Sequence, residues 1–296
     1  MTDPRPLTSP STTPPSATPL PLKLAAVQMD IALADKPRNL ERIEGFLGEA
    51  AAAGAGLVVF PECCVTGYCF DSKDEAWPFA ETVPGPACDR LTAACRRHAC
   101  FTVVGLLEKD GERLFNTAVL IGPDGVAGKY RKVHLPYLGV DRFTTSGDQG
   151  FGVFAAGSAR VGMNICYDGA FPEAARIMAL DGADVICLPT NWPPGAECTA
   201  DYVINTRALE NKVFFVAVNR VGTERGFPFI GKSKICDTHG NPLAVAEHTR
   251  ETILLADIDL ADARRKRIVR VPDKHIIDRF ADRHPELYQR LVQRQG

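Results

Sequence analysis

Three features that would point to a particular class of protein are missing from this sequence. No apolar run approaches the roughly 20 residues that a membrane-spanning helix needs, and the N-terminus has no charged region followed by an apolar stretch. Neither sign of charge dominates, because 34 Lys and Arg stand against 36 Asp and Glu, for a net charge of −2. We therefore expect a cytoplasmic protein with neither a membrane nor a nucleic acid as its partner.

Paired spacings typical of metal sites are also absent. The chain has no Cys-x-x-Cys and no His-x-x-x-His, so no metal and no other cofactor is expected. Ten cysteines are present, but a chain of 296 residues without a secretory signal does not depend on disulfides. We expect reduced thiols, most of them small buried hydrophobic residues.

The hydrophobic fraction of 45% and charged fraction of 24% are those of an ordinary globular protein. Residues 1–22 are rich in Pro, Ser and Thr and are predicted to be a disordered tail. Beyond them, apolar periodicity and turn residues predict a succession of strands and helices. The expected strands are 24–29, 57–60, 101–107, 114–121, 126–130, 161–165, 184–188, 213–218, 230–237, 243–245 and 252–257. The expected helices are 39–53, 86–98, 172–180, 199–212 and one that begins at Ala261.

Short turns join the three strands between residues 101 and 130, so these strands must be antiparallel and the fold cannot contain only parallel strands. No convincing linker follows residue 22. We expect one α/β domain over residues 23–270, with a mixed sheet or two sheets. Residues 271–296 are interpreted as a polar tail that could contact another subunit. The basic run Arg264–Arg267 is interpreted as a solvated helix face or a subunit contact.

Cys166 is the cysteine whose surroundings differ from the rest. It follows a short apolar strand, and Pro172 with Glu173 then opens a helix that stops at Gly182. A thiol at such a strand-to-helix turn can be exposed above the sheet edge, with free backbone N–H groups just beyond it. Cys166 is therefore our candidate nucleophile.

Two further reactive side chains also follow strands, Glu62 after 57–60 and Lys132 after 126–130. Ligands gather at the carboxyl ends of strands in open α/β sheets, so these three side chains could meet in one cleft. A cysteine needs a base to become a thiolate, and Glu62 could take that proton. Lys132 and the N–H of Tyr167 could stabilise an oxyanion.

Three segments resemble the signature segments of the nitrilase superfamily of carbon-nitrogen hydrolases: Phe60-Pro-Glu62, Tyr130-Arg-Lys132-Val-His-Leu-Pro136 and Asn164-Ile-Cys166-Tyr-Asp168. They occur in the family's order, and the resemblance covers roughly residues 23–270. It implies that Glu62 is the general base, Lys132 the transition-state stabiliser and Cys166 the nucleophile. It also implies an α-β-β-α sandwich that pairs into a homodimer or a higher homo-oligomer.

Many amide-cleaving members carry a second glutamate after the lysine segment, whereas residues 135–148 here contain none. Asp141 is the nearest candidate to replace it, and a solvated loop aspartate is the alternative. Tyr68, Asn191 and Trp192 are candidate substrate-binding residues, with packing or turn roles as alternatives. His134 raises a rival mechanism, a cysteine–histidine dyad, although a structural hydrogen bond suits its position better.

The sequence thus predicts a hydrolase of non-peptide C–N bonds that acts on a small amide or N-carbamoyl substrate through a cysteine thioester. True nitrilases tend to carry a Trp-Glu pair after the cysteine, whereas this chain has Tyr167 and Asp168. Two alternatives stay open: a nitrilase that converts a nitrile to an acid, and a non-catalytic binding or regulatory protein that has kept the fold.

Overall fold

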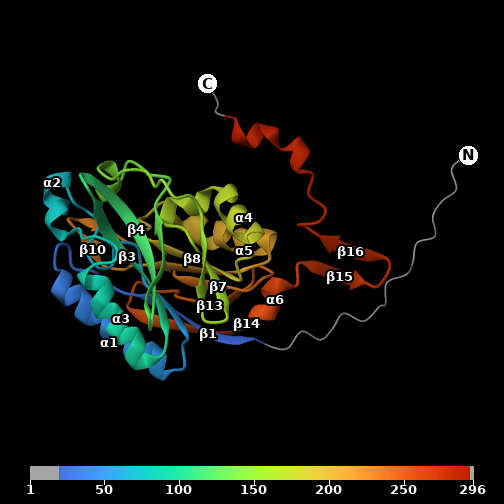
Figure 1. Cartoon of the computed structure of the whole chain (residues 1–296), viewed down its shortest axis with the longest axis horizontal. Coiled ribbons are helices and arrows are strands. Elements are labelled where there is room, and N and C mark those ends of the chain that lie inside the picture. The colour runs from blue at the N-terminus through green and yellow to red at the C-terminus, as the bar shows by residue number, and fades with distance from the viewer. Residues whose placement is uncertain (1–19, 294–296) are drawn as a thin grey trace, which may run out of the picture.

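Two six-stranded mixed sheets form the centre of the computed structural model, which describes residues 20–293 (Figure 1). The first sheet has the spatial order β14 (Thr252–Asp259), β1 (Pro21–Gln28), β2 (Leu57–Val59), β3 (Phe101–Asp110), β4 (Arg113–Gly122) and β5 (Gly125–Arg131). The second has the order β13 (Pro242–Val245), β12 (Lys234–Cys236), β9 (Phe214–Asn219), β8 (Val185–Thr190), β7 (Ala159–Met163) and β6 (Val153–Ala156). In each sheet the middle strands are parallel and the outer ones antiparallel.

Helices cover the outer face of each sheet. The helices α1 (Lys36–Ala52) and α3 (Pro86–His98) lie on the first sheet, and α4 (Pro172–Leu180) and α5 (Ile204–Asn211) lie on the second. Consecutive residues of a strand face opposite sides, so Val58 packs under α1 and α3 while Val59 packs between the two sheets. Because both faces are covered, the central strands are apolar throughout rather than alternating. The architecture is the expected α-β-β-α sandwich in a single domain.

Shorter elements complete the described chain. They are α2 (Lys73–Ala76), β10 (Thr223–Glu224), β11 (Phe227–Pro228), α6 (Leu260–Arg264), β15 (Arg267–Val271), β16 (His275–Asp278), the 3₁₀ helices η1 (Trp77–Phe79), η2 (Gly139–Arg142), η3 (Cys166–Ala170), η5 (Pro285–Leu287) and η6 (Gln289–Val292), and the π-helical turn η4 (Thr199–Val203). No helix among residues 20–293 is long and apolar enough to cross a lipid bilayer.

The first strand begins earlier than the sequence predicts. β1 starts at Pro21, inside the predicted tail, because it pairs along its whole length with β14, from Pro21 opposite Asp259 to Gln28 opposite Thr252. Pairing with a distant strand cannot be read from local composition. The rest of the predicted tail, residues 1–19, lies outside the described residues.

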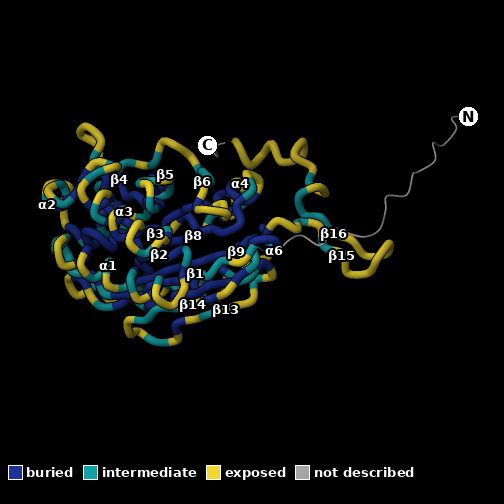
Figure 2. Tube along the Cα trace, turned by 60° about the horizontal axis from the view of Figure 1, so that its bottom comes forward, coloured by how far each residue is buried: buried dark blue, intermediate teal, exposed yellow. Residues whose placement is uncertain are grey.

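The C-terminal end differs most from expectation. The predicted basic helix is only the short α6, and residues 267–293, which we call the C-terminal arm, begin with the antiparallel hairpin β15–β16. The hairpin projects from the sandwich and most of the arm is exposed (Figures 1 and 2), whereas Phe280 packs against the core and Arg279 donates to the Leu209 carbonyl.

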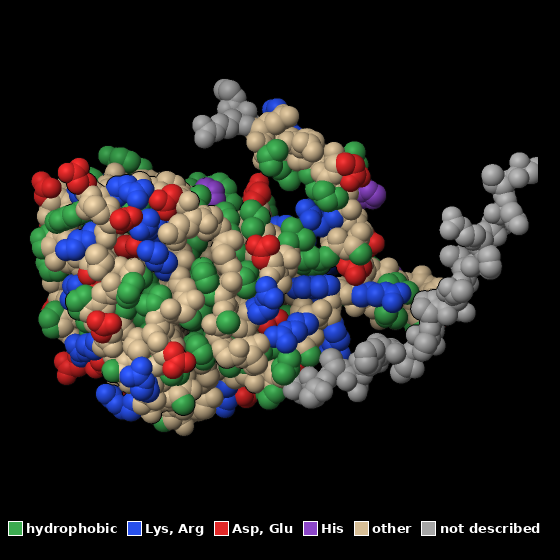
Figure 3. Space-filling view, in the orientation of Figure 1, with side chains coloured by type: hydrophobic (Ala, Val, Ile, Leu, Met, Phe, Trp, Pro, Cys, Tyr) green, Lys and Arg blue, Asp and Glu red, His purple; other side chains and the backbone are tan. Residues whose placement is uncertain are grey.

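Basic side chains gather where the arm leaves the body (Figure 3). Two of them are held by the body itself, because Arg264 pairs with Asp184 at 2.7 Å and Lys266 donates to the carbonyls of Asn211 and Lys212. This use of the side chains departs from a purely solvated helix face.

Candidate active site

Glu62 is positioned by the segment that follows β2. That segment is tied to the neighbouring β3, since Phe60 N–H donates to the Val103 carbonyl and Val65 N–H to the Gly105 carbonyl. Gly105 has to be a glycine, because a Cβ at this position would lie 2.3 Å from the Cys63 nitrogen and 2.8 Å from the Glu62 Cα. This close approach directs the Glu62 side chain into the interior, where it is fully buried.

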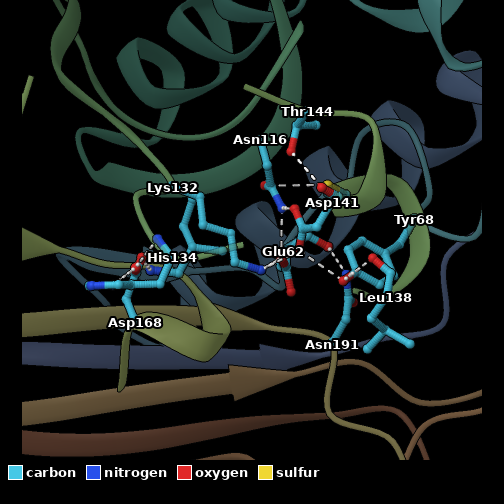
Figure 4. A network of polar contacts seen from close by, with 12 residues as sticks. Glu62, Tyr68, Asn116, Lys132, His134, Leu138, Asp141, Thr144, Asp168 and Asn191 are labelled. Carbon is cyan, nitrogen blue, oxygen red and sulfur yellow. Dashed lines mark hydrogen bonds and ion pairs between the residues drawn. The ribbon is translucent and has the colours of Figure 1, made fainter. Parts of the chain in front are cut away.

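Lys132 extends the edge strand β5 by one residue. Its N–H donates to the Asn116 carbonyl of β4 at 2.8 Å, which fixes the backbone. Its ammonium group is fully buried and lies 2.6 Å from Oε1 of Glu62 and 2.5 Å from Oδ2 of Asp141. Figure 4 shows Glu62 in the middle of this network, with Lys132, Asn116 and Asp141 around it.

Cys166 lies at the predicted strand-to-helix turn, as the first residue of η3 between β7 and α4, with a left-handed φ of 46°. The parallel register pairs Met163 with Cys187, so three residues further on Cys166 comes beside Thr190, at the end of β8. The Thr190 hydroxyl and the Asn191 N–H face the sulfur and lower the pKa of the thiol, against the burial that raises it. The residue is only 7% exposed.

Asp168 holds the turn after Cys166 in place. Its carboxylate is fully buried and accepts hydrogen bonds from the Ile165 N–H at 2.9 Å and the Tyr130 hydroxyl at 2.8 Å. It also accepts from the backbone N–H of His134. The turn that carries Cys166 is thereby held to the segment that carries Lys132.

Burial sets the protonation of the cluster. It raises the pKa of Glu62 from 4.5 to about 7, with the Lys132 ammonium opposing the shift and the Asp141 charge adding to it. Burial, followed by the charge of Glu62, raises the pKa of the Cys166 thiol to about 12. Burial also works against the charge of Lys132, yet the carboxylates of Asp141 and Glu62 hold the pKa of this ammonium well above 10.5. The resting thiol is therefore neutral near pH 7.

Asp141 reaches the cluster from η2 and is buried, so it is not a solvated loop residue. The Tyr68 hydroxyl lies 2.9 Å from its Oδ2, and the Tyr68 ring packs over Lys132, with Nζ 5.9 Å from the ring centre. A Cβ at Gly139, where φ is +48°, would lie 2.3 Å from the Tyr68 ring. This glycine therefore lets η2 come close enough for the short aspartate side chain to reach Lys132.

The other predicted site residues are placed as follows. The side-chain amide of Asn191 donates to the backbone carbonyl of Glu62 at 3.2 Å, so it helps to hold the backbone of Glu62 in place. Trp192 is buried, and its backbone N–H donates to Oδ1 of Asn219 at 2.8 Å. The Tyr167 ring is 44% exposed and packs edge-on against Phe171. An oxyanion contact by the Tyr167 N–H stays a prediction.

His134 is occupied elsewhere. Its Nδ1 lies 2.7 Å from Asp168 (Figure 4). Its ring stacks on Phe171 with ring centres 3.6 Å apart. This geometry supports the structural hydrogen bond rather than a cysteine–histidine dyad.

The sequence reasoning missed Asn116. It lies in β4, and its amide donates to Oε1 of Glu62 at 2.7 Å and to Oδ1 of Asp141 at 2.9 Å. The one available signal was an asparagine inside the predicted strand 114–121, most of whose residues are apolar.

Within residues 20–293, no group of three or more His, Cys, Asp or Glu side chains is arranged to hold a metal ion. All ten cysteines lie in this range and are free thiols.

A model of the carbon-nitrogen hydrolase family matches residues 23–268. The chain belongs to this family. It is 42% identical over 270 residues to a nitrilase from Pyrococcus abyssi, covering 91% of this chain and 100% of that relative. It is 32% identical over 285 residues to an N-carbamoylputrescine amidase from Solanum lycopersicum, covering 88% of this chain and 92% of that relative.

The fold also matches solved structures of carbon-nitrogen hydrolases. The hydrolase from Helicobacter pylori G27 superposes with a TM-score of 0.83 at 24% identity, covering 93% of this chain and 99% of the other. The two-sheet sandwich is thus the fold of the nitrilase superfamily, as the three sequence segments implied.

Proposed function

We propose that this carbon-nitrogen hydrolase cleaves a small non-peptide amide or N-carbamoyl compound through a thioester on Cys166. The observation that carries the proposal is the buried Lys132 ammonium, which is held between the carboxylates of Glu62 and Asp141. The charges of Lys132 and Glu62 both act on the Cys166 sulfur. A buried base, a fixed positive charge and a thiol are the three parts that acyl transfer requires.

In the proposed reaction, Glu62 takes the thiol proton as the sulfur attacks the carbonyl carbon. Lys132 and the Tyr167 N–H stabilise the oxyanion. Glu62 then gives its proton to the leaving nitrogen, so that the C–N bond breaks, ammonia or an amine departs and the thioester remains. Water, deprotonated by Glu62, attacks the thioester, and the acid leaves as the sulfur regains its proton. With a pKa of about 7, Glu62 can both accept and return a proton near neutral pH.

We assign Asp141 the position of the family's second glutamate, since it contacts Lys132 and Asn116 despite its shorter side chain. Tyr68 and Trp192 are proposed to form walls of the substrate site. Asn191, whose amide holds the Glu62 backbone, is proposed to act chiefly as a support.

The choice between amide and nitrile rests on opposing observations. The Tyr167-Asp168 pair after the nucleophile, and relatives such as the carbamoylputrescine amidase, favour an amide or carbamoyl substrate. The 42% identity to a protein called a nitrilase supports the alternative.

Substrate sets that share one side chain and differ only in their amide, N-carbamoyl or nitrile group separate these possibilities. We expect ammonia release and acid formation from the amide or carbamoyl member, and none from the nitrile. Turnover of nitriles with inert amides would overturn the amide assignment. A chain that is inert toward all three classes and forms no acyl adduct on Cys166 would favour a binding or regulatory protein.

We also propose that two copies pair through the C-terminal arm and the face formed by α4 and α5. A lone two-stranded hairpin is marginally stable in water, and this one is not joined to either large sheet. Large apolar side chains are exposed on the arm and on the helical face: Ile177, Leu180, Leu209, Val269, Val271, Leu287, Leu291 and Val292. Pairing of two copies would remove these side chains from water.

Sedimentation analysis over a range of concentrations tests the pairing. We expect the mass of a dimer or of a multiple of it, and a shift toward the monomer when Leu287 and Leu291 are both changed to Asp. A single-chain mass at every concentration would contradict the proposal. The free thiols support a reducing, cytoplasmic location for this assembly.

A further inference from the structure

Asn116 connects the two carboxylates of the candidate site. Each of its two amide protons is donated to a different carboxylate, one to Oε1 of Glu62 and one to Oδ1 of Asp141 (Figure 4). Its own oxygen accepts from the Cys63 thiol at 3.5 Å, and its backbone carbonyl accepts from the Lys132 N–H. Every polar group of Asn116 that faces the site is therefore in use, and the side chain is 1% exposed.

The two oxygens of Glu62 are treated differently by this arrangement. Oε1 accepts from Lys132 Nζ at 2.6 Å and from Asn116 Nδ2 at 2.7 Å, so it has two strong donors. Oε2 is equally buried, and no group in the described part of the chain hydrogen-bonds to it. A buried carboxylate oxygen without a partner is costly, and such atoms occur where a substrate or a transferred proton completes the set.

We propose that Asn116 is a positioning residue that pins Oε1 of Glu62 and so reserves Oε2 for proton exchange with Cys166 and with the leaving nitrogen. This inference rests on the proposed function, since it assigns different roles to the two carboxylate oxygens of the proposed base. An amide is the group that suits the task. A serine has one proton to donate and an aspartate would add a third negative charge, whereas a glutamine is one methylene too long.

The same hydrogen bond has an electrostatic consequence. A donor to Oε1 stabilises the ionised carboxylate, so the Asn116 amide lowers the pKa of Glu62 against the burial that raises it. The charged and titratable groups that also face Glu62 are Cys63, Tyr68, Lys132, Asp141 and Cys166. Without the amide, the pKa of Glu62 should rise above about 7, and the base should be available only at higher pH.

The test compares Asn116→Ala with the wild type by two pH profiles between pH 5 and 9. One is kcat/KM for the best amide substrate, and the other is the rate at which iodoacetamide alkylates Cys166, resolved by peptide mass spectrometry. We expect the acidic limb, near pH 7 in the wild type, to move upward by about half a pH unit or more, since a hydrogen bond to a charged group is worth at least about 1 kcal/mol. We also expect kcat to fall by at least about 10-fold, because the proton acceptor is no longer held in place.

Thr117→Val is the matched control. Thr117 is the next residue of β4, is equally buried, and donates to the carboxylate of Glu108 at 2.9 Å, away from the cluster. In this variant the acidic limb of both pH profiles should stay at its wild-type position. Two results would overturn the inference and leave Asn116 a structural residue. In one, the acidic limb of the pH profile moves equally in both variants; in the other, Asn116→Ala lowers the rate by the same factor at every pH without moving the limb.

Two further outcomes are covered. If Asn116→Ala does not fold, Asn116→Ser, which keeps one donor, is measured in the same way; a shift in the same direction supports the proposal and a wild-type limb overturns it. If the wild type hydrolyses no amide, the proposed function fails, while the alkylation profile still decides whether Asn116 sets the ionisation of Glu62.

Discussion

Cys166→Ala is expected to abolish hydrolysis, with kcat reduced at least about 10⁴-fold. The covalent step needs the sulfur, and no neighbouring group can replace it, since Thr190 is an alcohol without a base of its own. The same change should remove the acyl adduct that mass spectrometry detects when the wild type is quenched during turnover. The fold should survive, because the residue packs at a turn rather than in the middle of a sheet.

Cys187→Ala is the control for this experiment. Cys187 lies on β8, opposite Met163 of β7, and is fully buried in the core cluster shared by the two sheets. Its replacement should lower the free energy of unfolding by about 1–2 kcal/mol through the lost packing while leaving kcat nearly unchanged. Full activity of Cys166→Ala, or equal inactivation by both changes, would contradict Cys166 as the nucleophile.

Lys132→Met should have the second largest effect and should alter both activity and stability. Removing an oxyanion donor costs about 10²- to 10³-fold in kcat. The buried Glu62 and Asp141 would also face each other without the ammonium that separates them, which should cost about 3–5 kcal/mol in the free energy of unfolding. Urea unfolding of the purified variant measures this loss.

The sign of the pH dependence makes this prediction specific. Without Lys132, the pKa of Glu62 rises further above its unfolded value near 4.5, so the folded state binds more protons than the unfolded state. In the wild type Glu62 loses its proton as the pH rises through about 7, whereas in the variant it keeps the proton to higher pH. The stability deficit of Lys132→Met should therefore be larger at pH 8 than at pH 5, with the increase confined to pH values above about 7. A deficit that is the same at both values would show that the charge of Lys132 is not what holds the two carboxylates together.

Two comparisons complete the experiment. Lys23→Met breaks the partly exposed pair of Lys23 with Asp257 and should cost less than about 1 kcal/mol. His134→Ala should retain acylation, because its ring is held by Asp168 and Phe171. Loss of acylation in His134→Ala alone, with Lys132→Met still acylated, would favour the cysteine–histidine dyad.

The sequence was sufficient to predict which strands end at the candidate site. Glu62, Lys132 and Cys166 each lie just beyond the carboxyl end of a strand, and the carboxyl ends of strands are where side chains become free to converge. The strand-to-helix turn at Cys166 could be predicted because Pro172 and Glu173 are strong local signals for the start of a helix. Asp141 could be named but not placed, since its contact with Lys132 depends on how closely η2 approaches Tyr68.

The parts that could not be predicted depend on contacts between distant segments. Asn116 lies within a strand, and its sequence neighbours do not reveal that two carboxylates from other elements end beside it. The hairpin β15–β16 lies in a segment so polar and basic that composition favours a helix or a tail. Its strand character follows from pairing across a short turn, with Ile268 opposite Ile277.

The burial of Cys166 has a consequence for the lifetime of the enzyme. Peroxide oxidises thiolates far more readily than thiols, and a sulfur that gives up its proton only beside a bound substrate offers an oxidant little to attack between turnovers. The burial that makes a separate base necessary in the proposed mechanism would thus also protect the idle Cys166 sulfur from irreversible damage.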